Sequence, residues 1–186
     1  LWDWDVPSGR VYFSAAWKAL LGFGDDQVGG SLQEWEVRLH ADDREDAYAA
    51  LQRHFDGIDV QYRSEFRMRH ADGSWRWILD RGKVVNWTVD GKPLRMVGTH
   101  KDITSEKLAE QAAQDALRLQ RELFDFIPAS VCLLEPDGTI VHVNRSWHAF
   151  FAANGGDCAN ALVGSNYLAV CDKTRGLEAD GARQVA

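Results

Sequence analysis

The sequence has few cysteines and no long apolar run, and each shortage excludes a class of protein. Its three cysteines, Cys132, Cys158 and Cys171, form no Cys-x-x-Cys pair, so we expect reduced thiols instead of a disulfide framework or a zinc site. No apolar stretch approaches the roughly 18 residues that cross a bilayer, so no membrane span is expected. The chain also opens on Leu1 without an initiator methionine or a basic signal-peptide start. This opening favours a segment of a longer, cytoplasmic protein.

A basic excess is also lacking. The chain has 21 basic and 28 acidic residues, a net charge of −7 and a pI near 5.3, which argues against a nucleic-acid partner. Hydrophobic residues make up 45% and charged residues 26%, as in an ordinary globular chain. A length of 186 residues exceeds one domain of roughly 100–150 residues and falls short of two.

The first hundred residues predict a mixed α+β domain. Alternating residues predict strands at 2–6 and 11–13, and Ser14 can cap a short helix that ends before Gly22. A longer helix is predicted to about Phe55, with Asp42 or Asp43 as its cap. Three strands follow at 60–69, 75–87 and 93–103, joined at Asp-Gly turns. Their pattern indicates an antiparallel sheet with one solvated face.

The period becomes helical from 105 to 126. Six apolar residues recur there at spacings of three and four, which is a heptad seam. These are Ala109, Ala112, Ala116, Leu119, Leu123 and Phe126. The seam predicts a linker helix that joins domains or forms a coiled-coil homodimer. The alternative is an amphipathic helix that packs on its own domain.

Residues 127–186 repeat the beginning of the chain. A turn glycine, a helix cap and a helix tryptophan recur in the same order, as Gly9, Ser14 and Trp17 and again as Gly138, Asn144 and Trp147. The cap precedes the tryptophan by three residues both times. A repeat of roughly 130 residues predicts a second copy of one module, which stops before any counterpart of the three long strands.

Several stretches together resemble the PAS family, in the form that carries a C-terminal PAC motif. For residues 1–104 they are Trp2-Asp3-Trp4-Asp5, Gly9-x-Val11-Tyr12-Phe13-Ser14-x-x-Trp17, His40-x-Asp42-Asp43, Phe66 to Ile78 and Met96 to Thr104. Ala41 departs from the proline that the family usually has there. The second segment, 127–186, resembles the N-terminal half of another PAS domain through Pro136-Asp137-Gly138, Val143-Asn144-x-x-Trp147 and Val163-Gly164-x-Asn166-Tyr167.

The resemblance implies a PAS fold, a five-stranded antiparallel sheet whose flanking helices enclose a small cavity. It also implies a sensory and signal-relay module of a bacterial histidine kinase or diguanylate cyclase/phosphodiesterase, with no catalysis by this chain. Asp102, Ile103 and Thr104 would pass the signal to the linker helix, which Asp102 or Thr104 can cap. The partners are then a second copy and a downstream output domain. The alternatives are a dimerisation module without a ligand and an enzyme that uses the cavity.

The cavity residues stay open between a ligand site and plain core. The candidates share an inward-facing strand position: Tyr62, Phe66, Met68, Trp77, Met96 and Gly98. No cofactor is predicted. The cysteine motif of flavin photoreceptor PAS domains is absent, and His54 is the one helix histidine that could suit haem.

Three patterns suggest other chemistry. His40-x-Asp42-Asp43 could bind a metal, but a loop and helix start explain it better. Arg63, Arg67 and Arg69 form a basic stripe that is either solvated or a partner surface. Gly155-Gly156-Asp157 resembles a cyclase signature without its next two residues, so no catalytic or metal site is predicted.

Overall fold

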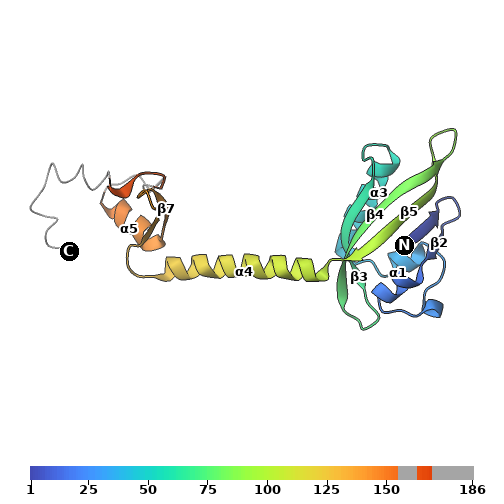
Figure 1. The fold of residues 1–186 in the computed structure, drawn as a ribbon, viewed down its shortest axis with the longest axis horizontal. Coiled ribbons are helices and arrows are strands. Elements are labelled where there is room, and N and C mark those ends of the chain that lie inside the picture. The colour runs from blue at the N-terminus through green and yellow to red at the C-terminus, as the bar shows by residue number, and fades with distance from the viewer. Residues whose placement is uncertain (155–162, 169–186) are drawn as a thin grey trace, which may run out of the picture. The chain divides into compact units, whose positions relative to one another are not determined.

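The computed structural model describes residues 1–154 and 163–168, and the chain divides into two compact units, 1–111 and 112–186. In the first unit (Figure 1) two short strands are followed by five helices and then by three long strands. Its strands are β1 (Trp2–Asp5), β2 (Arg10–Phe13), β3 (Tyr62–Arg69), β4 (Trp75–Trp87) and β5 (Pro93–Asp102). Its helices are α1 (Ala15–Leu20), η1 (Asp25–Gln27), α2 (Gln33–Glu36), η2 (Ala41–Asp43) and α3 (Arg44–Phe55).

The five strands form one antiparallel sheet in the order β2-β1-β5-β4-β3. This confirms the predicted fold class. Gly73 and Gly91 have φ values of 88° and 76°, a left-handed conformation that glycine adopts without strain. They make the two predicted hairpin turns, and β4 can therefore pair with β3 on one side and β5 on the other.

The core lies between one face of the sheet and the helices. Inward strand residues such as Phe66, Met68 and Ile78 are fully buried, and they pack with Trp17 of α1 and Trp35 of α2. Aromatic rings contribute most of the buried apolar area that stabilises such a small core. Four tryptophans, Trp2, Trp4, Trp17 and Trp35, are among these buried rings.

The caps differ in part from the predicted ones. Ser14 accepts the amide of Trp17 at 3.3 Å, as predicted. The carboxylate of Asp43 makes no capping bond at α3, because it accepts from the guanidinium and the backbone amide of Arg67. His40 instead caps the preceding 3-10 turn by accepting the amide of Asp42 through Nδ1. The bonds from Arg67 of β3 thus take the place of a local cap at Asp43.

The arginine stripe is largely paired. Arg67 bonds Asp43, Arg63 bonds Glu65 at 2.9 Å, and the guanidinium of Arg69 lies 5.2 Å from the ring of Trp75. The His40-x-Asp42-Asp43 stretch belongs to the same neighbourhood. Its groups serve the helix start and Arg67.

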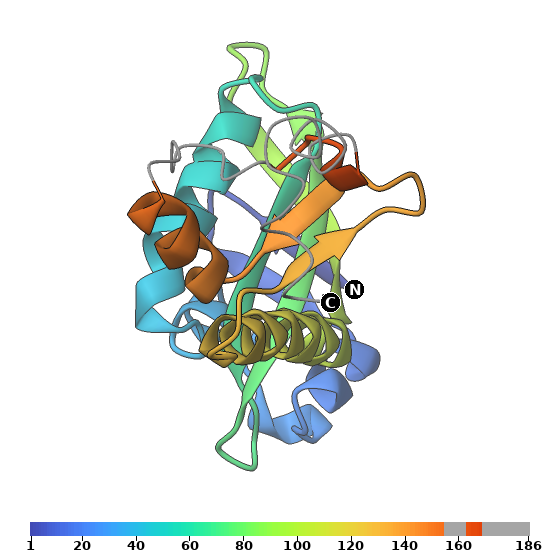
Figure 2. The same cartoon turned by 90° about the vertical axis from the view of Figure 1, so that its left-hand side faces the viewer.

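The second unit repeats the start of the first. After the helix α4 (Thr104–Phe126) it has β6 (Cys132–Leu134), β7 (Ile140–Val143) and α5 (Arg145–Ala153), and Figure 2 shows the hairpin in orange with α5 near it. Asn144 caps α5 by accepting the amide of Trp147 at 3.0 Å, as Ser14 does in α1. Gly155-Gly156-Asp157, Cys158 and Cys171 lie outside the described residues.

The linker helix is present from Thr104 to Phe126, one residue longer than predicted at its start. None of the helices in the described ranges combines the length and apolarity that a bilayer crossing requires.

Candidate functional site

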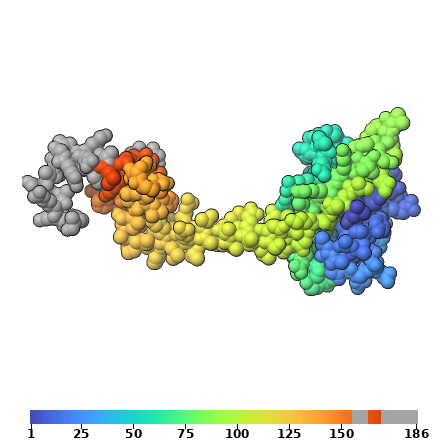
Figure 3. Space-filling view, viewed as in Figure 1, coloured from blue at the N-terminus to red at the C-terminus, as the bar shows by residue number. Residues whose placement is uncertain are grey.

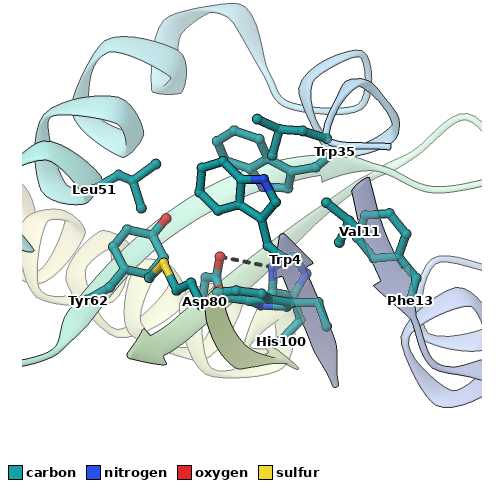
Figure 4. Close-up of a pocket in the computed structure, with 11 residues that line it drawn as sticks. Trp4, Val11, Phe13, Trp35, Leu51, Tyr62, Asp80 and His100 are labelled. Atoms are coloured by element: carbon teal, nitrogen blue, oxygen red, sulfur yellow. Dashed lines mark hydrogen bonds and ion pairs between the residues drawn. The ribbon is translucent and has the colours of Figure 1, made fainter. Parts of the chain in front are cut away.

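A small cavity lies in the first unit between the inner face of the sheet and the helices α2 and α3. Its free volume is about 40 Å³, which is room for one to three water molecules. Figure 4 shows Tyr62, Asp80 and His100 at the strands, with the indoles of Trp4 and Trp35 above them. The full lining is Trp2, Trp4, Val11, Phe13, Leu32, Trp35, Leu51, Tyr62, Asp80, Met96 and His100.

The ring of Trp2 covers the floor of the cavity. Trp2 pairs with Gly98 on β5, and Gly98 pairs with Gly82 on β4, so the ring lies across two residues without side chains. A Cβ at Gly82 would come 2.6 Å from the ring, and one at Gly98 would overlap both the ring and the Arg81 carbonyl oxygen. The space that glycine opens in the last strand is therefore filled by Trp2.

A buried carboxylate joins three strands beside this ring. Asp80 is 4% exposed, and its Oδ1 accepts the indole N–H of Trp2 at 2.8 Å. Its Oδ2 lies 3.0 Å from Nε2 of His100. Burial, then the negative charge of Asp80, raises the pKa of the Tyr62 phenol well above its usual range. Such a charge is stable inside a core only when it is paired and hydrogen-bonded, which these partners achieve.

The structure places the six predicted cavity residues differently. Tyr62 and Met96 line the cavity, Phe66 and Met68 are fully buried in the surrounding core, and Gly98 lies under Trp2. Trp77 does not line it. It lies on the outer face of β4, where Lys107 of α4 approaches its ring to 5.4 Å.

Sequence reasoning missed Asp80 and His100. A signal was present, because both occupy positions in β4 and β5 whose side chains alternate inward with Ile78 and Met96. A charged residue at such a position requires a buried partner, and a search for that partner leads to the other.

His54 has no free ring nitrogen. Its Nδ1 lies 2.8 Å from the carbonyl oxygen of Asp59, and Nε2 accepts the amide of Val84 at 3.1 Å. It is 4% exposed and fastens the end of α3 to β4. Within the described ranges no group of three His, Cys, Asp or Glu side chains has the arrangement of a metal site.

The second candidate site is the junction of β5 with α4. Asp102 accepts the amide of Thr104 at 2.8 Å, and Thr104 Oγ1 accepts the amide of Trp77 at 3.0 Å. Between them Ile103 is 6% exposed and donates its amide to the Trp77 carbonyl at 2.9 Å. Asp102 therefore caps the helix, while Thr104 ties its first turn to β4.

Ion pairs extend this junction across the outer sheet face. Lys107 Nζ lies 2.8 Å from Glu65 on β3, and Lys101 Nζ lies 2.7 Å from Glu106. The pKa of Glu65 is lowered, first by Lys107 and then by Arg63, and that of Lys107 is raised by Glu65. The first turns of α4 thus contact β3, β4 and β5 together.

Beyond these turns the side chains of α4 are exposed. Every residue from 108 to 123 is exposed, and Figure 3 shows the middle of this helix in yellow. Leu119, Leu123 and Phe126 of the predicted seam are 55%, 61% and 86% exposed. The first turns of α4 pack on the sheet, as the alternative of an amphipathic helix predicts, and the seam of residues 109–126 stays a prediction.

Comparisons with known proteins agree with this architecture. A PAS fold model matches residues 10–100, and a PAS domain model matches residues 118–181. A solved sensory box histidine kinase/response regulator from Burkholderia thailandensis is 38% identical, with a TM-score of 0.54 over 65% of this chain and 86% of that one.

Two curated relatives match most of the chain. The "Non-motile and phage-resistance protein" of Caulobacter vibrioides is 27% identical over 154 residues, which are 82% of this chain and 18% of the relative. "Sensor protein FixL" of Bradyrhizobium diazoefficiens is 28% identical over 142 residues, 75% of this chain and 27% of the relative. The chain thus spans less than a third of either relative's length. With two family models matched in tandem on the predicted fold, the chain belongs to the PAS family of sensory domains.

Proposed function

We propose that this chain is a sensory and signal-relay module of a bacterial multidomain signalling protein. A change at the cavity alters the inner face of β4 and β5, and the junction at Asp102, Ile103 and Thr104 passes that change to α4. The chain has no catalytic role of its own. It acts in the cytoplasm on an output domain that follows in the same parent protein.

The observation that carries this proposal is the shared use of β4 and β5. Asp80 and His100 line the cavity from these strands, and Trp77 and Asp102 of the same strands hold the start of α4. Asp80 pairs with His100, and Ile78, two residues away on β4, pairs with Asp102. A shift of β4 against β5 therefore changes the angle or register at which α4 begins.

Similarity supports a histidine kinase as the output. The solved relative at 38% identity is a histidine kinase/response regulator by its name. A diguanylate cyclase or phosphodiesterase is the other output that the PAS resemblance implies. In either case a bias of a few kcal/mol between two packings suffices to shift the population of states.

Hydrogen exchange along the full chain tests the relay. We expect Trp35→Phe, which alters the cavity wall, to change amide exchange at residues 105–111. The added substitution Asp102→Ala should abolish this response. Val28→Ala is the matched control, because Val28 is 6% exposed in the same core and does not line the cavity.

The result that contradicts the proposal is equally specific. If Trp35→Phe and Val28→Ala change exchange at 105–111 to the same extent, α4 responds only to the stability of the domain. The chain would then act as a dimerisation module without a sensory cavity, the main alternative.

Turnover addresses the remaining alternative. Kinase, cyclase and nucleotide-hydrolysis assays on the purified chain should give no activity above the background. Robust turnover would establish an enzyme that uses the cavity.

A further inference from the structure

Two hydrogen-bond donors in the cavity wall have no partner. The indole nitrogens of Trp4 and Trp35 form no hydrogen bond within the described part of the chain, although these residues are only 8% and 7% exposed. Both line the cavity, and Figure 4 draws them among the other lining side chains. Because an unpaired buried N–H is costly, these donors favour an acceptor that enters the cavity.

The carboxylate that the wall supplies is already in use. Asp80 is the one carboxylate in the lining, and its two oxygens are engaged by Trp2 at 2.8 Å and His100 at 3.0 Å. A ligand therefore meets the two indole N–H groups, the unpaired Nδ1 of His100 and no free carboxylate oxygen. The two indole donors favour a molecule that accepts hydrogen bonds, and Nδ1 of His100 can pair with a water molecule beside it.

The charge and shape of the cavity wall restrict the chemical class of the ligand further. Asp80 and His100 face each other, and the other lining side chains are uncharged, so an ionic ligand would lose its hydration without a free counter-charge. The remaining wall is apolar, including Val11, Leu51 and Met96. A flat cofactor cannot lie on the sheet, because Trp2 covers Gly82 and Gly98.

Size is the last constraint. A volume of about 40 Å³, room for about three water molecules, admits a molecule of about three or four non-hydrogen atoms. Ligands of this size bind weakly, with dissociation constants of about 0.1–10 mM.

We infer that the cavity binds a small uncharged organic molecule whose carbonyl-type acceptor receives the indole N–H of Trp4 or Trp35. The biological role of this binding rests on the proposed sensory function. The binding itself can be measured independently of that function. Water offers the same acceptor chemistry, and the experiment separates the two.

The probes are acetone and isobutene, which have nearly the same shape and differ in the acceptor. Indole cross-peaks of the ¹⁵N-labelled chain are assigned with Trp4→Phe and Trp35→Phe and followed during titration. We expect acetone to shift the Trp4 or Trp35 indole proton downfield with a saturable, millimolar curve. Isobutene should bind about tenfold or more weakly, because it leaves the donors unpaired.

Two tryptophans of the same domain are internal controls. Trp17 Nε1 is also buried and unpaired but does not line the cavity, and Trp2 Nε1 is already bonded to Asp80. Neither indole proton should show the shift that acetone produces at Trp4 or Trp35.

Three results would overturn the inference. The first is equal binding of isobutene and acetone, which would show an unselective apolar void. The second is the same response at Trp17 as at Trp4 and Trp35. The third is no saturable shift up to about 100 mM acetone, which would show that water holds these donors. None of these results bears on whether α4 responds to the cavity wall, so the proposed relay is judged separately.

Discussion

The contact between Trp2 and Gly98 shows how one residue without a side chain determines the cavity. Since the ring lies where a Cβ would stand, we predict that Gly98→Ala lowers the free energy of unfolding by about 2–4 kcal/mol. Gly30→Ala is the control, because its Cβ would meet only the Val11 carbonyl oxygen at 3.5 Å. It should change stability by less than about 1 kcal/mol. Urea unfolding followed by tryptophan fluorescence measures both variants, and similar values for the two would refute the packing argument.

Asn144 holds more of the second unit together than its counterpart Ser14 holds in the first. Fully buried, it accepts the amides of Val131 and Trp147 and donates to the carbonyls of Phe124, Ile127 and Ala129. Ser14 has no amide with which to make such donations. Within the second unit this side chain connects the end of α4 to β6 and α5, together with the bonds of Asp125 to Arg145 and of Ser146 to Ile127.

Removing this side chain gives the second prediction. Asn144→Ala should destabilise the second unit by about 3 kcal/mol, since it leaves buried backbone groups unpaired. We expect faster amide hydrogen exchange at Val131 and Trp147 in this variant. Asn154→Ala is the matched control, because Asn154 is exposed and its side chain donates to the Phe150 carbonyl within its own helix end. Unchanged exchange at Val131 in Asn144→Ala would contradict the role assigned to Asn144.

At the scale of the element, the carboxylate of Asp43 forms an ion pair with Arg67 of β3 instead of capping α3 as predicted. This ion pair connects the start of α3 to β3. The guanidinium and the backbone amide of Arg67 lower the pKa of Asp43 below its usual value of 3.8. A lowered carboxyl pKa stabilises the folded state above the unfolded-state pKa, and this contribution is lost as the pH falls through the folded-state pKa.

The third prediction follows from that sign. Asp43→Asn should cost about 1 kcal/mol near pH 7, and the difference from the wild type should shrink as the pH falls below about 4. Urea unfolding at a series of pH values measures it, with Asp90→Asn in an exposed turn as the control. A difference that stays constant from pH 7 to pH 3 would show that the charge of Asp43 does not contribute.

Elements were predictable where their signal is local. The strands from 60 to 103 follow from a period of two and from Asp-Gly turns, and α1 follows from Ser14 and Gly22. The cap of α3 was not predictable, because Arg67, the partner of Asp43, lies 24 residues away. The prediction of the cavity lining was incomplete for the same reason. Whether Gly98 opens a space depends on the ring of Trp2, which is distant in the chain.

At the scale of the whole molecule, the chain combines a PAS fold in its first unit, the helix α4 and a second segment that a PAS domain model matches over residues 118–181. The hairpin β6–β7 is the whole of the second sheet within the described ranges, and Leu133, Leu134 and Val141 on it are 42–48% exposed. A short strand pair with exposed apolar residues depends on neighbouring structure for its stability. The repeat was predictable from Gly138, Asn144 and Trp147, because caps and turns are local signals.

The exposed seam of α4 leads to the last prediction, which concerns assembly. Apolar residues that repeat at heptad spacing and stay exposed are stabilised when a second helix covers them, so we expect a homodimer through Leu119, Leu123 and the alanines before them. Leu119→Asp with Leu123→Asp should convert the dimer to a monomer in native mass spectrometry and light scattering. Gln111→Asp with Gln114→Asp adds the same charge to exposed positions off the seam and should leave the dimer intact. If both double variants keep the oligomeric state of the wild type, the seam does not mediate association. If both dissociate, the added charge and not the position is responsible.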